Sequence, residues 1–318
     1  LGMAVYGLLA GYGVNGFIGS KFGGGSRFQG SIGNPAYVAA YAIYMIFYAL
    51  YLLVSKYKKN IRSIGAISLF LLIIIFLTVF FAAATRGAFV GLIASITAFV
   101  VYFVFSAKRG RKWFISAAVL MLIFISIMIY FKDSKFVKSL PGSRIFDISF
   151  TTKTFADRAT MWKIAIDGWK ERPILGWGPE NYIQVFDRHF NTNYFKPAEG
   201  FGAWFDRAHS VYFDYLVETG ILGLLSYLAI FAVFYWQVLK SQISNLKSQI
   251  LNTNRKNEKE KASISGHRSS VTNALVFALP VAYLVQGIVL FDVFPIYINN
   301  FLFLAFAAYY LDFKNKNQ

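Results

Sequence analysis

His209 lies where a long polar segment meets an apolar run, and it is one of only three histidines in the chain. Imidazole titrates near neutral pH, so at a membrane surface it could take a proton from an acceptor hydroxyl. Glu218 follows nine residues later, within or just below the outer boundary of that run. A carboxylate there needs a partner or water, so it either pins the loop or holds a basic group in place. Taken alone, His209 is also compatible with a hydrogen-bonded interfacial histidine that does no chemistry.

Two arginines are predicted to lie on the same side of the membrane as His209. Arg86 stands in a tight junction between two apolar runs, with no acidic residue nearby in sequence. It either has a functional role or snorkels to the interface. Arg158 lies on an amphipathic segment one turn before Trp162. Alternatively, Arg158 lies on a solvated helix face and pairs with Asp157 or Asp206.

Together these residues fit one chemistry, the transfer of a group from a lipid diphosphate. Two arginines can bind phosphate oxygens bidentately and stabilise the charge that develops on the leaving group. The histidine can remove the proton of the acceptor hydroxyl. Such a site does not need a metal, and we find no cluster of Asp and Glu of the Asp-x-Asp kind. That absence argues against a metal-dependent glycosyltransferase.

Composition assigns the class of protein. The chain is 57% hydrophobic and only 15% charged, which indicates an all-α polytopic membrane protein. With no cysteine it has no disulfide and no thiolate chemistry.

Because the chain opens inside an apolar run, we expect it to be the C-terminal part of a larger protein. Eight spans are predicted, the first truncated: 1–14, 36–54, 64–84, 88–106, 113–131, 211–238, 273–290 and 296–311.

Basic residues predict the orientation of these spans. If every span crosses once, one side carries 17 basic and 3 acidic residues, or +14, and the other 15 basic and 12 acidic, or +3. The basic side should be cytoplasmic. The net charge of +17 is therefore mainly a topology signal and not a sign of nucleic-acid binding.

This topology predicts the organisation of the chain. The outer segment 132–210 is too long to be a passive connector. Within it, residues 155–173 have the spacing of an amphipathic helix ended by Pro173, and 176–182 predicts a turn followed by a short helix. The predicted divisions are five membrane helices in 1–131, an extracytoplasmic catalytic loop at 132–210, a sixth helix at 211–238, a basic cytoplasmic linker at 239–272, and two last helices with a cytoplasmic tail at 273–318.

Four motifs follow one another along the chain: GNPAYVAAY (33–41), ATRGAFVG (84–91), DRATMWKIAIDGWKERPILGWGPENY (157–182) and AHSVYFDYLVETGILGLL (208–225). In this order they resemble the O-antigen ligase and O-antigen polymerase superfamily of bacterial membrane glycosyltransferases. The resemblance covers roughly residues 27–238. Ala36 stands where the first motif of that family usually has asparagine.

The resemblance implies a bundle of the lipid-sugar-using glycosyltransferase type, capped by a periplasmic loop, in the bacterial cytoplasmic (inner) membrane. The implied donor is an undecaprenyl-diphosphate-linked glycan, with no cofactor. Arg86 and Arg158 would contact the diphosphate, and His209 would act as the base or orient the acceptor. Supporting roles would fall to Glu218, Asn34 and Asn181.

The acceptor stays open among a lipid, a glycan and a protein. A ligase of lipopolysaccharide biosynthesis, which uses lipid A core, is placed first. A polysaccharide polymerase or a protein O-glycosyltransferase is the alternative in the same class. From another class, a lipid-sugar or anion transporter would need polar residues along a membrane path, which the spans supply poorly. A scaffold would leave the long outer loop unexplained.

Overall fold

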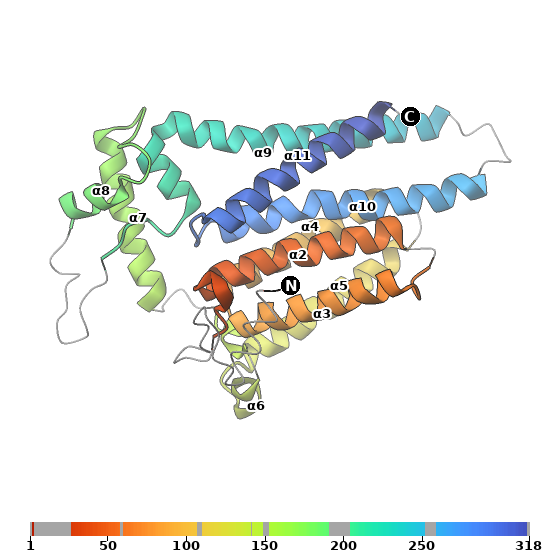
Figure 1. Cartoon of the computed structure of the whole chain (residues 1–318), viewed down its shortest axis with the longest axis horizontal. Helices are drawn as coiled ribbons and strands as arrows, with labels where there is room; N and C mark the ends of the chain where they lie inside the picture. Colours follow the sequence, from red (N-terminus) through yellow and green to blue (C-terminus); the bar gives the residue numbers. More distant parts are fainter. Residues whose placement is uncertain are drawn as a thin grey trace. The chain divides into compact units, whose positions relative to one another are not determined.

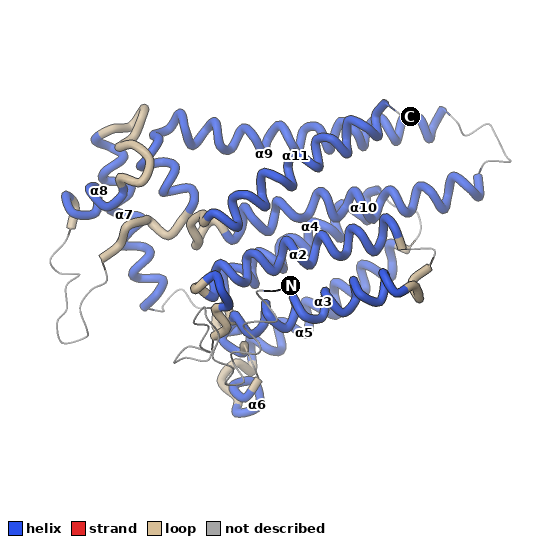
Figure 2. The backbone as a smooth tube through the Cα atoms, viewed as in Figure 1, coloured by secondary structure: helices blue, strands red, loops and turns tan. Residues whose placement is uncertain are grey.

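The chain folds into helices in a computed structural model that describes residues 2, 27–57, 60–106, 110–140, 142–148, 153–190, 204–251 and 259–316. Within these ranges, side chains are described except at 244–251, 259–269 and 313–316. Helices make up about 80% of the described residues, and no strand occurs among them (Figure 2). The predicted all-α class is therefore confirmed.

Six helices in the described part of the chain are long and apolar enough to cross a membrane, which confirms a polytopic membrane protein. They are Pro35–Lys56, Ile64–Ala83, Arg86–Ser106, Arg111–Tyr130, Val211–Ile243 and Phe294–Asp312. The expected span 1–14 lies outside the described residues.

The expected span at 273–290 differs in the structure. Its helix, α10 (Lys259–Gln286), ends at Gln286, and the apolar part, Ser270–Gln286, is shorter than the six spans. Residues 287–290 are apolar, but the carbonyls of Gly287 and Leu290 accept the backbone N–H of Val211 at 2.9 and 3.0 Å. Hydrophobicity alone does not distinguish such a turn from a further turn of helix.

The chain divides into two units, and each is described by itself. Unit 1 comprises Leu1–Ile148, Tyr235–Val285 and Phe294–Gln318. Helix α2 packs against α3, α4 and α11, and α4 against α5. Its elements before residue 148 are η1 (Gly30–Ile32), α2 (Pro35–Lys56), α3 (Ile64–Ala83), α4 (Arg86–Ser106), α5 (Arg111–Tyr130), α6 (Lys135–Ser139) and η2 (Ser143–Phe146) (Figure 1). The later part of unit 1 holds α10 up to Val285 and the whole of α11 (Phe294–Lys316).

Local sequence starts and stops the helices that position the site in unit 1. Asn34 accepts the backbone N–H of Ala36 at 2.8 Å, and Pro35 follows in the first turn, where its missing N–H costs nothing. Helix α3 ends at Ala83, and Ala84, the residue that caps it, adopts a left-handed φ of 46°. The chain then enters α4 at once, with Arg86 as its first residue.

Unit 2 comprises Ser149–Phe234 and Gln286–Val293. It contains α7 (Lys153–Glu171), α8 (Tyr182–Arg188) and the first part of α9 (Val211–Leu251). Its hydrophobic core joins the three: Met161 and Ala165 of α7, Val185 of α8 and Val217 of α9 are all buried there. The predicted amphipathic helix, and the turn followed by a short helix, are thus both found in this unit.

The charged segment 239–272 was expected to be a linker, and part of it is helical. Helix α9 continues past the expected end at 238 to Leu251, and α10 begins at Lys259. Residues 252–258 lie outside the described ranges.

Candidate active site

Two of the sequence motifs meet in unit 2 through backbone hydrogen bonds. The N–H groups of Trp177 and Gly178 donate to the carbonyls of Val217 and Glu218 at 2.9 and 2.8 Å. These carbonyls are accessible because α9 is interrupted at Gly220, whose φ of 67° and ψ of −171° are non-helical. The turn after α7 therefore docks onto the break in α9.

Glycine is required at this contact. A Cβ on Gly220 would lie 2.2 Å from the backbone oxygen of Ile174, and one on Gly176 would lie 2.5 Å from the backbone carbon of Glu218. Both residues also have positive φ, a region that side chains disfavour. The glycines of the two motifs thus permit a close approach of two backbones.

His209 stands just before α9 in a strained conformation, with a φ of 57°. Its Nδ1 is 3.2 Å from the carbonyl oxygen of Arg207. Since a carbonyl only accepts, Nδ1 carries the proton, and Nε2 of the neutral ring carries the lone pair. The ring packs edge-on against Phe205 and Phe291, with centroids 5.4 and 4.9 Å away.

The surroundings of His209 favour the neutral ring. Burial lowers the pKa of His209 below its ordinary 6.5, the hydrogen bond to Arg207 opposes this, and the charge of Arg158 lowers the pKa further. Asp206 acts in the opposite direction with a smaller effect. At neutral pH the imidazole is therefore a base with an available lone pair.

The structure brings Arg158 and His209 into one electrostatic neighbourhood. On α7, Arg158 lies three and seven residues before Met161 and Ala165, which are buried in the unit 2 core, so the three share a helix face. Trp162 stacks on Phe213 of α9, with ring centroids 5.3 Å apart, and holds the helix against α9.

Arg207 was not identified from the sequence. It pairs with Glu180. Burial alone would lower the pKa of Arg207, but the hydrogen bond to Glu180 and the charges of Glu180, Glu218 and Asp214 outweigh burial and raise it. The adjacent Asp206 suggested a local ion pair, and this reading concealed Arg207. The signal available in the sequence was its position two residues before His209.

Two buried acidic residues of α9, Asp214 and Glu218, lie close to the segment that carries Arg207 and His209. Asp214 accepts the backbone N–H of Ala208 at 2.7 Å, which fixes the segment before His209. Glu218, only 8% exposed, lies close to Arg207 and to the backbone N–H of Glu180, and both stabilise negative charge on its carboxylate. Its surroundings therefore include the loop before α8 and a basic group.

The two candidate asparagines hold local backbone. Asn34 caps α2, as described above. Asn181 donates from Nδ2 to the carbonyl of Trp177 at 3.0 Å and accepts from Gln184 at 3.1 Å. These contacts fix the start of α2 and the turn before α8.

Arg86 belongs to unit 1, where the other two motifs meet. The hydroxyl of Thr85 donates to the carbonyl of Pro35 at 3.1 Å and accepts from Arg27 at 2.8 Å. Arg86 itself donates from Nη1 to the backbone carbonyl of Asp147 at 2.9 Å and lies 3.6 Å from its carboxylate. Asp147 was not identified from the sequence either, since 61 residues separate it from Arg86.

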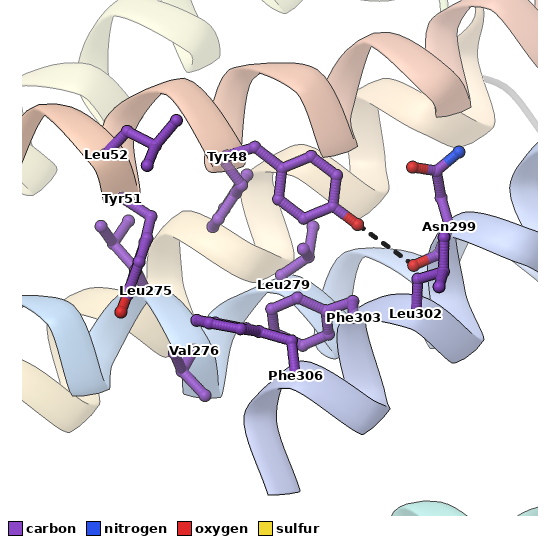
Figure 3. Close-up of a pocket in the computed structure, with 11 residues that line it drawn as sticks. Tyr48, Tyr51, Leu52, Leu275, Val276, Leu279, Asn299, Leu302, Phe303 and Phe306 are labelled. Carbon is purple, nitrogen blue, oxygen red and sulfur yellow. Dashed lines mark hydrogen bonds between the residues drawn. The ribbon is translucent and has the colours of Figure 1, made fainter. Parts of the chain in front are cut away.

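Neither the pocket nor the acidic residues suggest another site. A pocket of about 350 Å³ lies between α2, α10 and α11 of unit 1 and is lined almost wholly by apolar groups (Figure 3). Its polar contact is Tyr48, which donates to the carbonyl of Asn299 at 3.1 Å. In the part of the chain that the structure describes, no group of three or more His, Asp or Glu is placed to hold a metal ion.

Fold and site define a multi-pass, all-helical membrane protein with Arg86 at the start of α4, Arg158 on α7 and His209 just before α9. The model of the O-antigen ligase family matches residues 70–228, half of the chain, so the chain belongs to this family. The match includes Arg86, Arg158, Asn181, His209 and Glu218, and it begins after Asn34. No curated protein matches the chain. Members of the family are membrane glycosyltransferase-like enzymes, which indicates glycan and lipid-linked substrates.

Proposed function

We propose that this protein is a ligase-type glycosyltransferase, which moves a glycan from undecaprenyl diphosphate to a hydroxyl of lipid A core. The observation that carries the proposal is the contact of His209 Nδ1 with the carbonyl oxygen of Arg207, 3.2 Å away, which favours the tautomer whose Nε2 can accept a proton. A hydroxyl nucleophile needs such a base when its proton leaves.

In the proposed reaction, the acceptor oxygen forms a bond to the anomeric carbon of the donor glycan. The bond from that carbon to the diphosphate oxygen breaks, and the hydroxyl proton passes to Nε2 of His209. Arg86 and Arg158 stabilise the charge that grows on the departing diphosphate. Undecaprenyl diphosphate is the second product. These arginines supply the charge stabilisation that a metal ion supplies in other transferases.

Transfer in proteoliposomes tests the reaction. With purified lipid-linked glycan as donor and lipid A core as acceptor, His209→Gln should lower turnover about 10²–10⁴-fold, because glutamine hydrogen-bonds but does not titrate. Donor affinity should stay near that of the wild type. Arg86→Lys should instead weaken donor binding, since an ammonium does not reproduce bidentate contact.

Arg158→Gln should also weaken donor binding, and Lys163→Gln is its matched control, because Lys163 is exposed on the same helix. The rotation between them is about 140°. Full turnover of His209→Gln between pH 6 and 8 would contradict the base. Transfer to a glycan or a protein, but not to lipid A core, would contradict the ligase assignment while leaving the chemistry intact.

We also propose that residues 132–210 face outward and 239–272 face the cytoplasm, in the bacterial inner membrane. The support is the asymmetry of +14 against +3 in the loops. Single cysteines at Ser143 and Ser248 can be labelled in intact cells with a membrane-impermeant maleimide. We expect labelling at Ser143 alone. Labelling at Ser248 alone would reverse the orientation and place the site on the cytoplasmic side.

A further inference from the structure

Arg86 is one member of a basic cluster in unit 1, which we call the Asp147 cluster: Arg86, Lys132, Arg144 and Asp147. Lys132 donates from Nζ to Oδ1 of Asp147 at 2.7 Å, while Arg86 lies 3.6 Å from Oδ2. The bond from Lys132, with the charges of Arg86 and Arg144, outweighs burial and lowers the pKa of Asp147. The aspartate is therefore ionised at neutral pH, pairs with Lys132 and Arg86, and lies within the electrostatic influence of Arg144.

The loop that carries this cluster is fixed to the membrane helices. Phe146 is buried and packs edge-on against Phe89 of α4, with ring centroids 5.7 Å apart. Ile145 is 1% exposed. Gly142 has a φ of 77°, and a Cβ there would lie 2.2 Å from the backbone oxygen of Phe81, at the end of α3. Asp147 and Arg144 are thus held next to Arg86 by packing, and not by charge alone.

The charges of the cluster do not balance. Three cations face one carboxylate, which leaves a net charge of +2. The cluster also lies at the start of α4, whose first turn contains no acidic residue and whose N–H groups favour an anion. Lys132 is 34% exposed and Arg144 is exposed, so an anion can reach both. A phosphate group of charge −1 to −2 matches this charge and these donors.

We propose that Lys132 and Arg144 bind the phosphate groups of the donor lipid together with Arg86, and that Asp147 is a positioning residue that keeps the three cations apart and aimed outward. This inference rests on the proposed function, because it deepens the same donor site. Lys132 and Arg144 both lie outside the four sequence motifs. The same chemistry would also suit the headgroup of an anionic phospholipid, so the experiment must separate the two sources.

Binding of undecaprenyl diphosphate to the full chain in phosphatidylcholine nanodiscs tests the proposal. Lys132→Gln and Arg144→Gln should each weaken binding about tenfold, and the double variant about a hundredfold, with a shallower dependence on salt. Lys138→Gln is the matched control: Lys138 is a nearby exposed lysine that pairs with Asp133 instead of Asp147. Its affinity should equal that of the wild type. Thermal unfolding of each variant shows that it has folded.

The outcomes separate the possibilities. Wild-type affinity in the double variant, with weakened binding in Arg86→Gln, overturns this inference and leaves the proposed function standing. Wild-type affinity in Arg86→Gln as well removes the proposed donor site itself. Nanodiscs that contain phosphatidylglycerol supply the other source. If the double variant loses association with phosphatidylglycerol but keeps its affinity for undecaprenyl diphosphate, the cluster binds phospholipid headgroups and the inference is overturned.

Discussion

Each unit joins two of the four sequence motifs, but the two junctions differ in how they are built and in their charge. In unit 1 the junction is made by side chains, where Thr85 links Pro35 to Arg27. In unit 2 it is made by backbone bonds between the turn at 173–178 and the break at Gly220. Cations outnumber the acid in the Asp147 cluster, whereas three carboxylates surround Arg207.

The difference separates two tasks. A cluster with excess positive charge attracts phosphate. Because Asp147 is partly exposed, the cations that pair with it can also contact a bound phosphate. Arg207 is already neutralised, and its carboxylates hold the segment that carries His209. We therefore expect unit 1 to contribute mainly charge, and unit 2 to contribute mainly the geometry and proton chemistry of one imidazole.

Substitution of glycine should have the largest effect, and should reveal the backbone junction of unit 2. Gly220 has a conformation that is open essentially to glycine only, and a Cβ there would overlap the backbone of Ile174. Gly220→Ala should therefore cost about 3 kcal/mol or more of stability and abolish activity. Gly33→Ala in unit 1 is the control, since Gly33 has a φ of 79° but no atom within 4 Å of an added Cβ.

Gly33→Ala should cost only about 1–2 kcal/mol, because it carries the backbone strain without the overlap. Thermal unfolding in detergent measures both variants. Equal losses would show that strain alone matters and that the contact with Ile174 does not hold unit 2 together.

A pair of arginine variants should separate binding from stability. Arg86→Gln leaves Asp147 paired with Lys132 at 2.7 Å, so the protein should fold normally and lose donor affinity at least tenfold. Arg207→Gln removes the ion pair with Glu180 and the positive charge beside the buried Glu218. It should cost about 1–3 kcal/mol, less than a fully buried pair because Arg207 is 23% exposed.

Donor binding and thermal unfolding are measured on both proteins. The comparison between the units is wrong if the effects are exchanged, so that Arg86→Gln destabilises the protein and Arg207→Gln weakens donor binding at normal stability.

Much of the fold follows from the sequence because apolar runs and helical spacing are local signals. The amphipathic helix predicted at 155–173 is α7, within two residues at each end. The end of α10 at Gln286 was missed, because the carbonyls of Gly287 and Leu290 serve Val211, which is distant in sequence. A partner from another segment decides such a boundary, and local hydrophobicity does not record it.

The candidate site shows the same limit. Arg86, Arg158 and His209 stand out because charged groups are scarce near membrane spans. Asp147 and Lys132 do not, since they are polar residues in a polar segment, and only the fold of η2 brings Asp147 to Arg86. Arg207 was hidden by its neighbour Asp206, although its charge partners are Glu180 and two residues of α9.

The smallest expected effect concerns the pH dependence of unit 2. The charge of Arg158 lowers the pKa of His209, and that of Asp206 raises it. A base works only when unprotonated, so activity falls as the pH drops through the pKa of His209. Arg158→Gln removes a positive charge, raises the pKa and should move this acid limb to higher pH. Asp206→Asn removes a negative charge and should move the limb to lower pH.

Each shift should be less than about one pH unit, since one unit corresponds to about 1.4 kcal/mol and charge pairs near the surface are worth about 1 kcal/mol or less. Residual transfer by Arg158→Gln suffices, because the position of the limb does not depend on its height. Lys163→Gln serves as the control and should leave the limb in place. Shifts of opposite sign in the two variants identify His209 as the titrating base through its own neighbours. If both variants keep the wild-type limb, another group titrates, and His209 only orients the acceptor.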